Sequence, residues 1–244
     1  MATSDRAIAA LRLRLADAQR LIEIHEDATG SEPGRRRGYD VLNRSAVMLS
    51  IAAWEGFSED ILRAAVSAIA TKLRSTIEFP TNVRDAMLAY MHQDQNWSKL
   101  NAATKQGIWG IADDGWRVAY VKYASSRIEK LNTPNTENLT KLFASTIGLA
   151  DFSNNWGARR WSQADYITKL DGALTLRHRI AHGALGNETV GKSRARAAVS
   201  LVMRTSGWTA SAVDAHVSRL IAAYKIDLSR PLRDAIRAMD RTGY

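Results

Sequence analysis

The stretch LNRSAVMLSIAAWEGFSEDIL, residues 42–62, decides the fold class. Between Ala46 and Phe57 its apolar side chains lie on nearly all sides of a helix, and such a helix is buried against several neighbours. Elsewhere apolar residues recur at three- and four-residue spacing, and only 4 prolines and 15 glycines interrupt this pattern. The sequence therefore predicts an all-α protein with a long buried helix over about residues 39–74.

Other helices are predicted on both sides of this one. The first covers about residues 4–26 and ends at a linker of Gly, Pro, Ser and Arg. Shorter helices are expected over residues 81–131, where we interpret three tryptophans as a satellite core: Trp97, Trp109 and Trp116. Two more are expected over residues 136–147 and from Ser162 to the capping glycine, Gly183.

The C-terminal part is less clearly patterned. The stretch KSRARAAVSLVMR, residues 192–204, fits either a helix or a strand. A last helix is predicted from about Thr209 to Arg241, with a bend near Pro231. We expect one domain, 1–244, with a core over about 37–241 to which the N-terminal helix adds.

Composition limits the chemistry. The chain has 34 Lys and Arg against 25 Asp and Glu, so 34 − 25 gives +9, and this excess favours a polyanionic partner such as RNA. It has no cysteine, which excludes disulfides, thiolate zinc sites and cysteine nucleophiles and suits the cytoplasm. The sequence contains no uninterrupted apolar stretch of membrane-spanning length, so we expect no membrane contact.

Residues 171–183 contain the strongest functional pattern. On a helical wheel Arg177 lies at about 280°, inside the apolar arc, where a guanidinium needs a carboxylate, an interface or a cleft. His178, Asp171 and His182 lie together along one polar edge of the same helix. Glu55 lies on a largely apolar strip of the long helix and is a candidate ion-pair partner for Arg177.

Other patterns compete with this one. GNETVGKS, residues 186–193, matches the P-loop pattern but lacks its strand and sheet, so we reject NTP hydrolysis. Its backbone could still hold a phosphate, helped by three basic side chains: Lys192, Arg194 and Arg196. His178 and His182 are spaced for a metal but have no third ligand within reach, so we expect no metal and no cofactor.

A second candidate RNA surface combines planar rings with guanidinium groups. It consists of Trp156, Arg159, Arg160 and Trp161. Such side chains stack on unpaired bases and bind phosphates, although interhelical packing would also explain the tryptophans.

The sequence LRHRIAHG, residues 176–183, resembles the Arg-x4-6-His signature of HEPN domains. The signature is short, and with 25 arginines a chance match is expected; Arg20 to His25 is such a match. Its setting strengthens the first match, since residues 42–62 resemble the Glu-containing long helix of RiboL-PSP and similar HEPN subgroups. TENLTKLFASTIGL, residues 136–149, resembles the segment before their motif helix, while residues 187–207 resemble an insertion.

The resemblance implies an up-down helical bundle that dimerises through its motif helices. It also implies a metal-independent endoribonuclease with a toxin or phage-defence role, with Arg177 and His182 as the catalytic pair and His178 as the polar residue of the motif. In related systems an antitoxin or a nucleotidyltransferase is the partner. Positions five apart lie about 140° apart on a helix, so we favour a site shared across the dimer.

Two other classes of function stay open. One is a non-catalytic HEPN-like module that binds RNA, a nucleotide or a partner protein. The other is a structural or regulatory helical protein whose charge binds nucleic acid loosely.

Overall fold

The computed structural model describes residues 2–30, 38–73, 79–92, 102, 114–158, 160–186 and 188–222. Within these residues lie helices and no strand, and the all-α prediction is confirmed. The helices are α1 (Asp5–Thr29), α2 (Asp40–Lys72), α3 (Thr81–His92), α5 (Gly115–Glu129), α6 (Thr136–Ile147), α7 (Gln163–Ala181) and α8 (Lys192–Ala222).

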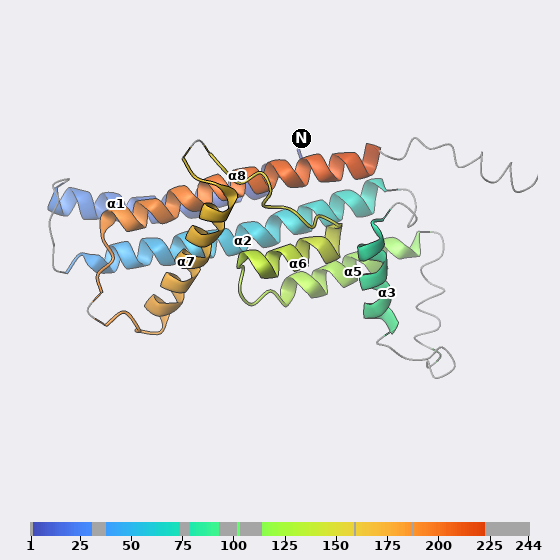
Figure 1. The fold of residues 1–244 in the computed structure, drawn as a ribbon, viewed down its shortest axis with the longest axis horizontal. Helices are drawn as coiled ribbons and strands as arrows, with labels where there is room; N and C mark the ends of the chain where they lie inside the picture. Colours follow the sequence, from blue (N-terminus) through green and yellow to red (C-terminus); the bar gives the residue numbers. More distant parts are fainter. Residues whose placement is uncertain are drawn as a thin grey trace, which may run out of the picture.

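Helix α2 is the centre of the fold. Figure 1 shows α1 and α8 beside it along much of its length, α5 and α6 beside its C-terminal half, and α7 crossing it steeply. Because neighbours surround it, side chains on several of its sides are fully buried, among them Ile51, Trp54 and Phe57. The prediction of a buried central helix from residues 42–62 is confirmed.

Helix α1 packs against this centre through one stripe. Its buried residues Leu11, Leu15, Ala18 and Ile22 recur every three to four positions, as the periodicity predicts. They belong to the same hydrophobic cluster as the core of α2. The N-terminal helix is therefore part of the packed core.

The segment that fitted either a helix or a strand is helical. Residues 192–204 form the N-terminal part of α8, which continues without interruption to Ala222. The prediction that the last helix begins near Thr209 is therefore wrong: it begins at Lys192. Its buried side chains, such as Ala195, Val199 and Val202, pack towards α1 and α2, so residues 192–207 belong to the core bundle.

The satellite core in the middle of the chain is present where the structure describes it. Trp116 is buried with its ring edge-on to Phe79, at a centroid distance of 5.4 Å, and Tyr120 lies on the other side of that phenylalanine. Trp97, Trp109 and the predicted bend at Pro231 lie outside the described residues. In the described part, none of the helices has the length and apolarity that crossing a membrane requires.

Candidate functional site

The candidate site is a cavity of about 370 Å³ between α2, α7 and the residues that precede α6. Helix α2 contributes Glu55 and Ile51 to its wall. The connecting segment contributes residues 132–135, and α7 contributes five residues: Asp171, Leu174, Thr175, Arg177 and His178. The cavity therefore combines a cation, two carboxylates and an imidazole with an apolar floor.

Both ends of α7 are fixed by local hydrogen bonds. Ser162 caps its start: the Ser162 hydroxyl accepts from the Asp165 N–H at 3.3 Å, and the Asp165 carboxylate accepts from the Ser162 N–H at 2.7 Å. These bonds from Ser162 lower the pKa of Asp165. At the other end Gly183 has φ +66° and donates to the carbonyl of Ile180.

The following N–H, of Ala184, donates to the carbonyl of Arg179 at 2.8 Å, which completes a Schellman motif. Gly183 is thus the predicted helix cap, since a left-handed φ favours glycine. The motif stops α7 so that His182 is its C-cap residue and is exposed.

Arg177 is partly buried on the cavity wall. Among the described residues it forms no ion pair, and the predicted pair between Glu55 and Arg177 is not formed, although both side chains line the same cavity. Each of the two is only partly buried, so solvent can hydrate both charges without a direct contact. The guanidinium is therefore held in a cleft with its donors uncommitted to a carboxylate.

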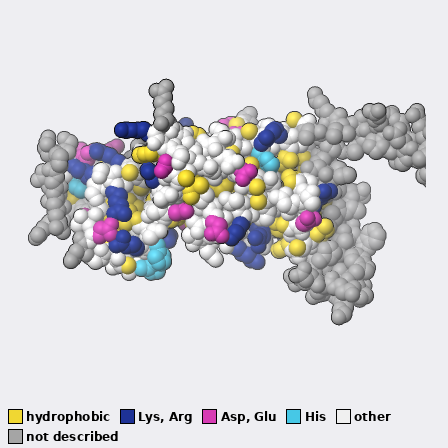
Figure 2. Space-filling model, viewed as in Figure 1, with side chains coloured by type: hydrophobic (Ala, Val, Ile, Leu, Met, Phe, Trp, Pro, Cys, Tyr) yellow, Lys and Arg dark blue, Asp and Glu magenta, His cyan; other side chains and the backbone are white. Residues whose placement is uncertain are grey.

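The two motif histidines lie next to each other at the C-terminal end of α7. Their ring centroids are 4.3 Å apart with planes inclined by 50°. His178 lines the cavity, whereas His182, one turn further, lies outside it. Figure 2 shows histidine side chains gathered at this end of α7 with Lys and Arg side chains near them. Arg177 and the histidine pair are therefore at one end of one helix, facing solvent.

Asp171 has a structural contact that its position on the wheel did not predict. Its carboxylate accepts from the backbone N–H and the hydroxyl of Thr136, at 3.3 and 3.4 Å. Thr136 is the first residue of α6, where unpaired N–H groups favour a negative charge. Asp171 therefore joins α7 to the start of α6 while its side chain also lines the cavity.

The wall opposite α7 is anchored to the core. The buried indole of Trp54 in α2 donates to the carbonyl of Pro134 at 2.9 Å. Asn135, the next residue, caps α6 by accepting from the N–H of Asn138 at 2.8 Å. These bonds fix the segment that closes the cavity, so its shape depends on the packed interior.

The basic side chains around the P-loop-like segment are engaged within the protein. Lys192 donates to the carbonyl of Gly30 at 2.6 Å, and Arg196 pairs with Glu26. Arg194 pairs with Glu188 at 2.5 Å. The segment is preceded by α7 rather than by a strand, so its resemblance to a P-loop has no structural counterpart here. Because the C-terminal end of α1 carries acidic and carbonyl groups, it binds two of these cations itself.

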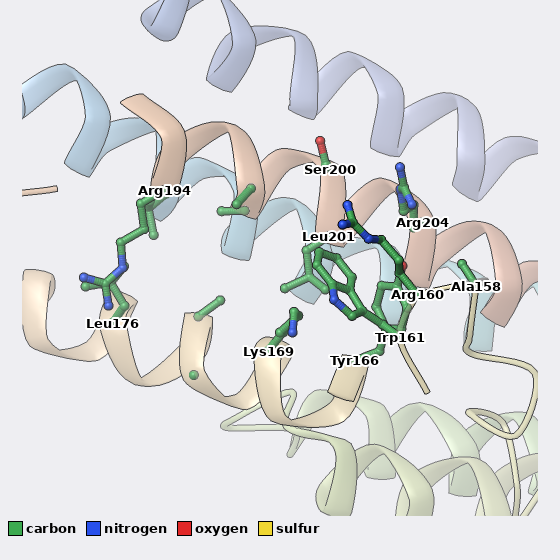
Figure 3. Close-up of a pocket in the computed structure, with 15 residues that line it drawn as sticks. Ala158, Arg160, Trp161, Tyr166, Lys169, Leu176, Arg194, Ser200, Leu201 and Arg204 are labelled. Atoms are coloured by element: carbon green, nitrogen blue, oxygen red, sulfur yellow. The ribbon is translucent and has the colours of Figure 1, made fainter. Parts of the chain in front are cut away.

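Of the second predicted RNA surface, Arg160 and Trp161 lie together at a separate cavity between α7 and α8, shown in Figure 3. Trp156 is buried, and its indole donates to the Thr209 hydroxyl at 3.2 Å, so packing explains that tryptophan. Arg159 lies outside the described residues.

Sequence reasoning missed several residues at these places. Glu188 forms ion pairs with both Arg179, at 2.6 Å, and Arg194, which joins the end of α7 to the start of α8. These two arginines lower the pKa of Glu188. Lys169 and Arg204 also line the second cavity. The periodicity of α8, had it been followed through residues 192–222, would have placed Arg204 on the same face as Leu201.

No cluster of three His, Asp or Glu side chains suited to a metal occurs in the part of the chain that the structure describes. The histidine pair at α7 has no third ligand among those residues.

An all-α core in which a helix carries Arg177, His178 and His182 before a glycine cap is the arrangement of a HEPN domain. A family model described as RiboL-PSP-HEPN matches residues 13–202, and the chain belongs to this family. The match includes α1 from its second turn onward and the start of α8. No curated protein and no solved structure matches the chain.

Proposed function

We propose that this protein is a metal-independent endoribonuclease that cleaves RNA by attack of the 2′-hydroxyl on the adjacent phosphate. The observation that carries the proposal is the placement of Arg177 in an open cavity, free of an ion pair within the described residues, beside two exposed histidines whose rings are 4.3 Å apart. Family membership supports a role connected with RNA.

The groups present are suited to each requirement of this reaction. A guanidinium donates two hydrogen bonds to a phosphate and stabilises the charge of the phosphorane. Imidazole groups titrate near neutral pH, so one can accept the 2′-hydroxyl proton and another can protonate the leaving 5′-oxygen. In our assignment Arg177 binds the phosphate and His182 transfers protons, with His178 as the adjacent imidazole and Glu55 as a carboxylate on the facing wall.

We further propose that two copies of the chain form the active site together. Arg177 lines the cavity, whereas His182 lies beyond it at the helix end, so one helix does not direct both groups at a single phosphate. A second copy related by a two-fold axis near the exposed end of α7 would supply the missing group to each site.

The first test is cleavage of purified RNA in the presence of a chelator. Wild-type protein should give fragments with 2′,3′-cyclic phosphate ends. Arg177→Ala and His182→Ala should each lower the rate by about 100-fold or more, with unchanged helicity. Retained cleavage in both variants, or cleavage that requires a divalent ion, would contradict the proposal.

A mixing experiment tests the shared site. When Arg177→Ala and His182→Ala proteins are mixed and allowed to exchange subunits, a shared site regenerates one intact Arg177 and His182 combination in each heterodimer. About a quarter of wild-type activity should return, because about half of the dimers are mixed and each has one good site. No recovery despite demonstrated exchange would place both groups in one protomer.

The biological role that we propose is that of a toxin or defence nuclease controlled by a partner, such as an antitoxin. Expression of the wild-type chain should arrest growth, and Arg177→Ala should relieve the arrest at equal protein level. Specific RNA binding without product, unaffected by Arg177→Ala, would instead favour the non-catalytic binding module.

A further inference from the structure

A second cavity, of about 570 Å³, lies between α7, α8 and the short segment that leads into α7. Figure 3 shows residues from all three elements around it: Trp161 and Arg160 from the segment, Lys169 from α7, and Leu201 and Arg204 from α8. Its volume is typical of sites that bind small organic ligands.

The floor of this cavity is apolar. Small and aliphatic side chains from three helices form it: Val47, Ala173, Leu176, Ala197, Ala198 and Leu201. Such a surface favours the burial of an apolar ligand body by removing it from water.

Its rim is charged with one sign only. Four of the lining residues are basic, Arg160, Lys169, Arg194 and Arg204, and none is acidic. Arg194 is committed to Glu188, but within the described residues none of the ion pairs involves the other three. Three cations around an apolar floor are therefore uncompensated by any carboxylate at ion-pair distance.

Aromatic groups complete the site. The Lys169 ammonium lies 4.2 Å from the centre of the Trp161 ring, and that indole is 45% exposed, which is unusual for so large a ring. Tyr166 is 1% exposed, and its hydroxyl has no hydrogen-bond partner among the described residues. A buried hydroxyl without a partner is a group that a bound ligand can satisfy.

The cavity is separate from the candidate nuclease site. Its α7 residues, among them Lys169, Ala173 and Leu176, lie on the face of the helix roughly opposite to the face of Asp171 and His178. The two lining sets share no residue. A ligand held here would bridge α7 and α8 without occupying the cleft of Arg177.

We infer that this cavity binds a small organic anion with a flat apolar body, such as an aromatic carboxylate or a nucleoside monophosphate. The body would lie on the aliphatic floor beside Trp161, and the anionic group would be bound by Arg160 and Arg204. The site does not depend on ribonuclease activity, since none of its residues takes part in the proposed cleavage.

The first experiment uses the fluorescent aromatic sulfonate 8-anilinonaphthalene-1-sulfonate as the probe on the full chain. Wild-type protein should give saturable enhancement of its emission. The double variant Arg160→Glu/Arg204→Glu should bind about 10-fold more weakly or worse, because each lost cation removes a charge-assisted contact. Arg12→Glu, a charge reversal at an exposed position of α1, is the matched control and should leave the affinity within about twofold.

Competition then identifies the ligand chemistry. Adenosine 5′-monophosphate or indole-3-carboxylate should displace the probe, and the more effective of the two distinguishes a phosphate from a carboxylate. Adenosine and indole, which lack the charge, should be at least about 10-fold weaker competitors. Thermal denaturation of each variant checks folding, and Arg160→Gln/Arg204→Gln replaces the double reversal if that protein does not fold.

Three results would overturn the inference. They are equal probe binding by the wild type and a folded double variant, equal displacement by charged and uncharged competitors, and displacement by single-stranded RNA but by neither small anion. Arg177→Ala should bind the probe as the wild type does. Loss of RNA cleavage and loss of anion binding are thus separate outcomes, and failure of one proposal leaves the other standing.

Discussion

Arg20 and His25 in α1 have the same spacing as Arg177 and His182 in α7, but their surroundings differ. Arg20 is exposed and pairs with Glu23 at 3.1 Å on its own helix. His25 is 5% exposed, and its imidazole Nδ1 lies 3.0 Å from the amide oxygen of Asn43. The α1 pair therefore consists of a solvated surface charge and a core histidine.

The α7 pair has the reverse arrangement. Its arginine is partly buried on a cavity wall, and its histidine is exposed at a helix end. A reactive pair needs an accessible proton-transfer group and a cation that is not already committed, and only α7 offers both. The comparison shows that the environment of each residue, rather than the spacing, separates a candidate site from a coincidence.

Substitution of the two histidines should separate them most strongly. His25→Ala should lower the free energy of unfolding by about 2–4 kcal/mol, because it leaves a cavity and removes the buried partner of Asn43. That amide also donates to the carbonyl of Val190 at 2.8 Å, so the change affects the contact between α2 and the segment before α8. His182→Ala, at an exposed position, should cost less than about 0.5 kcal/mol.

Urea denaturation followed by circular dichroism measures both values. A large loss in His182→Ala, or a negligible one in His25→Ala, would reverse the roles assigned to the two histidines.

Conservative substitution of the two arginines sharpens the comparison on the side of activity. Arg177→Lys keeps the charge in the cavity but loses the two-donor geometry for phosphate, so RNA cleavage should fall by about 10- to 100-fold. Arg20→Lys should cleave at the wild-type rate within about twofold, since its side chain makes only a surface pair. Single-turnover rates on one RNA measure both, and full activity in Arg177→Lys would show that charge alone suffices there.

Much of this difference follows from the sequence, and the reasons for the remainder are physical. The period of apolar residues predicted the buried α2 and the core stripe of α1, and the Gly183 cap followed from local chemistry. The missing Glu55–Arg177 pair did not, because a helical wheel gives directions on one helix but not the distance to another. Residues 192–204 satisfied both periods, and tertiary packing on α1 and α2 selected the helix.

The glycine cap separates the two matches in a further way, since only His182 is followed by one. Gly183→Ala should cost about 1 kcal/mol in unfolding free energy, because alanine is strained at φ +66° although nothing blocks its methyl group. Gly172→Ala is the matched control: it lies within the same helix, its methyl group also meets no atom within 4 Å, and it should stabilise by about 0.5–1 kcal/mol.

RNA cleavage should fall in Gly183→Ala and not in Gly172→Ala, because only the former lies beside His182. Equal stability of the two alanine variants would argue against the Schellman motif at the end of α7.

A third kind of histidine should give the smallest effect, which appears only as pH is varied. The His216 Nε2–H donates to the carbonyl of Ile147 at 2.7 Å, and burial lowers the pKa of this imidazole below its usual 6.5, aided by the charge of Arg219. The folded state thus prefers the neutral ring, and the unfolded state binds more protons as pH falls through 6.5.

Stability should therefore be complete above about pH 7, decline as the pH falls through 6.5, and level off below the folded pKa. His216→Gln preserves an N–H donor but cannot titrate, so its stability should decline less over this range. His178→Gln, at an exposed position solvated in both states, should keep the wild-type slope. Urea midpoints at intervals between about pH 5 and 8 measure the three slopes. If the slope vanished in His178→Gln and persisted in His216→Gln, the exposed end of α7 would be the structural histidine site and the assignment of its imidazoles to catalysis would lose its basis.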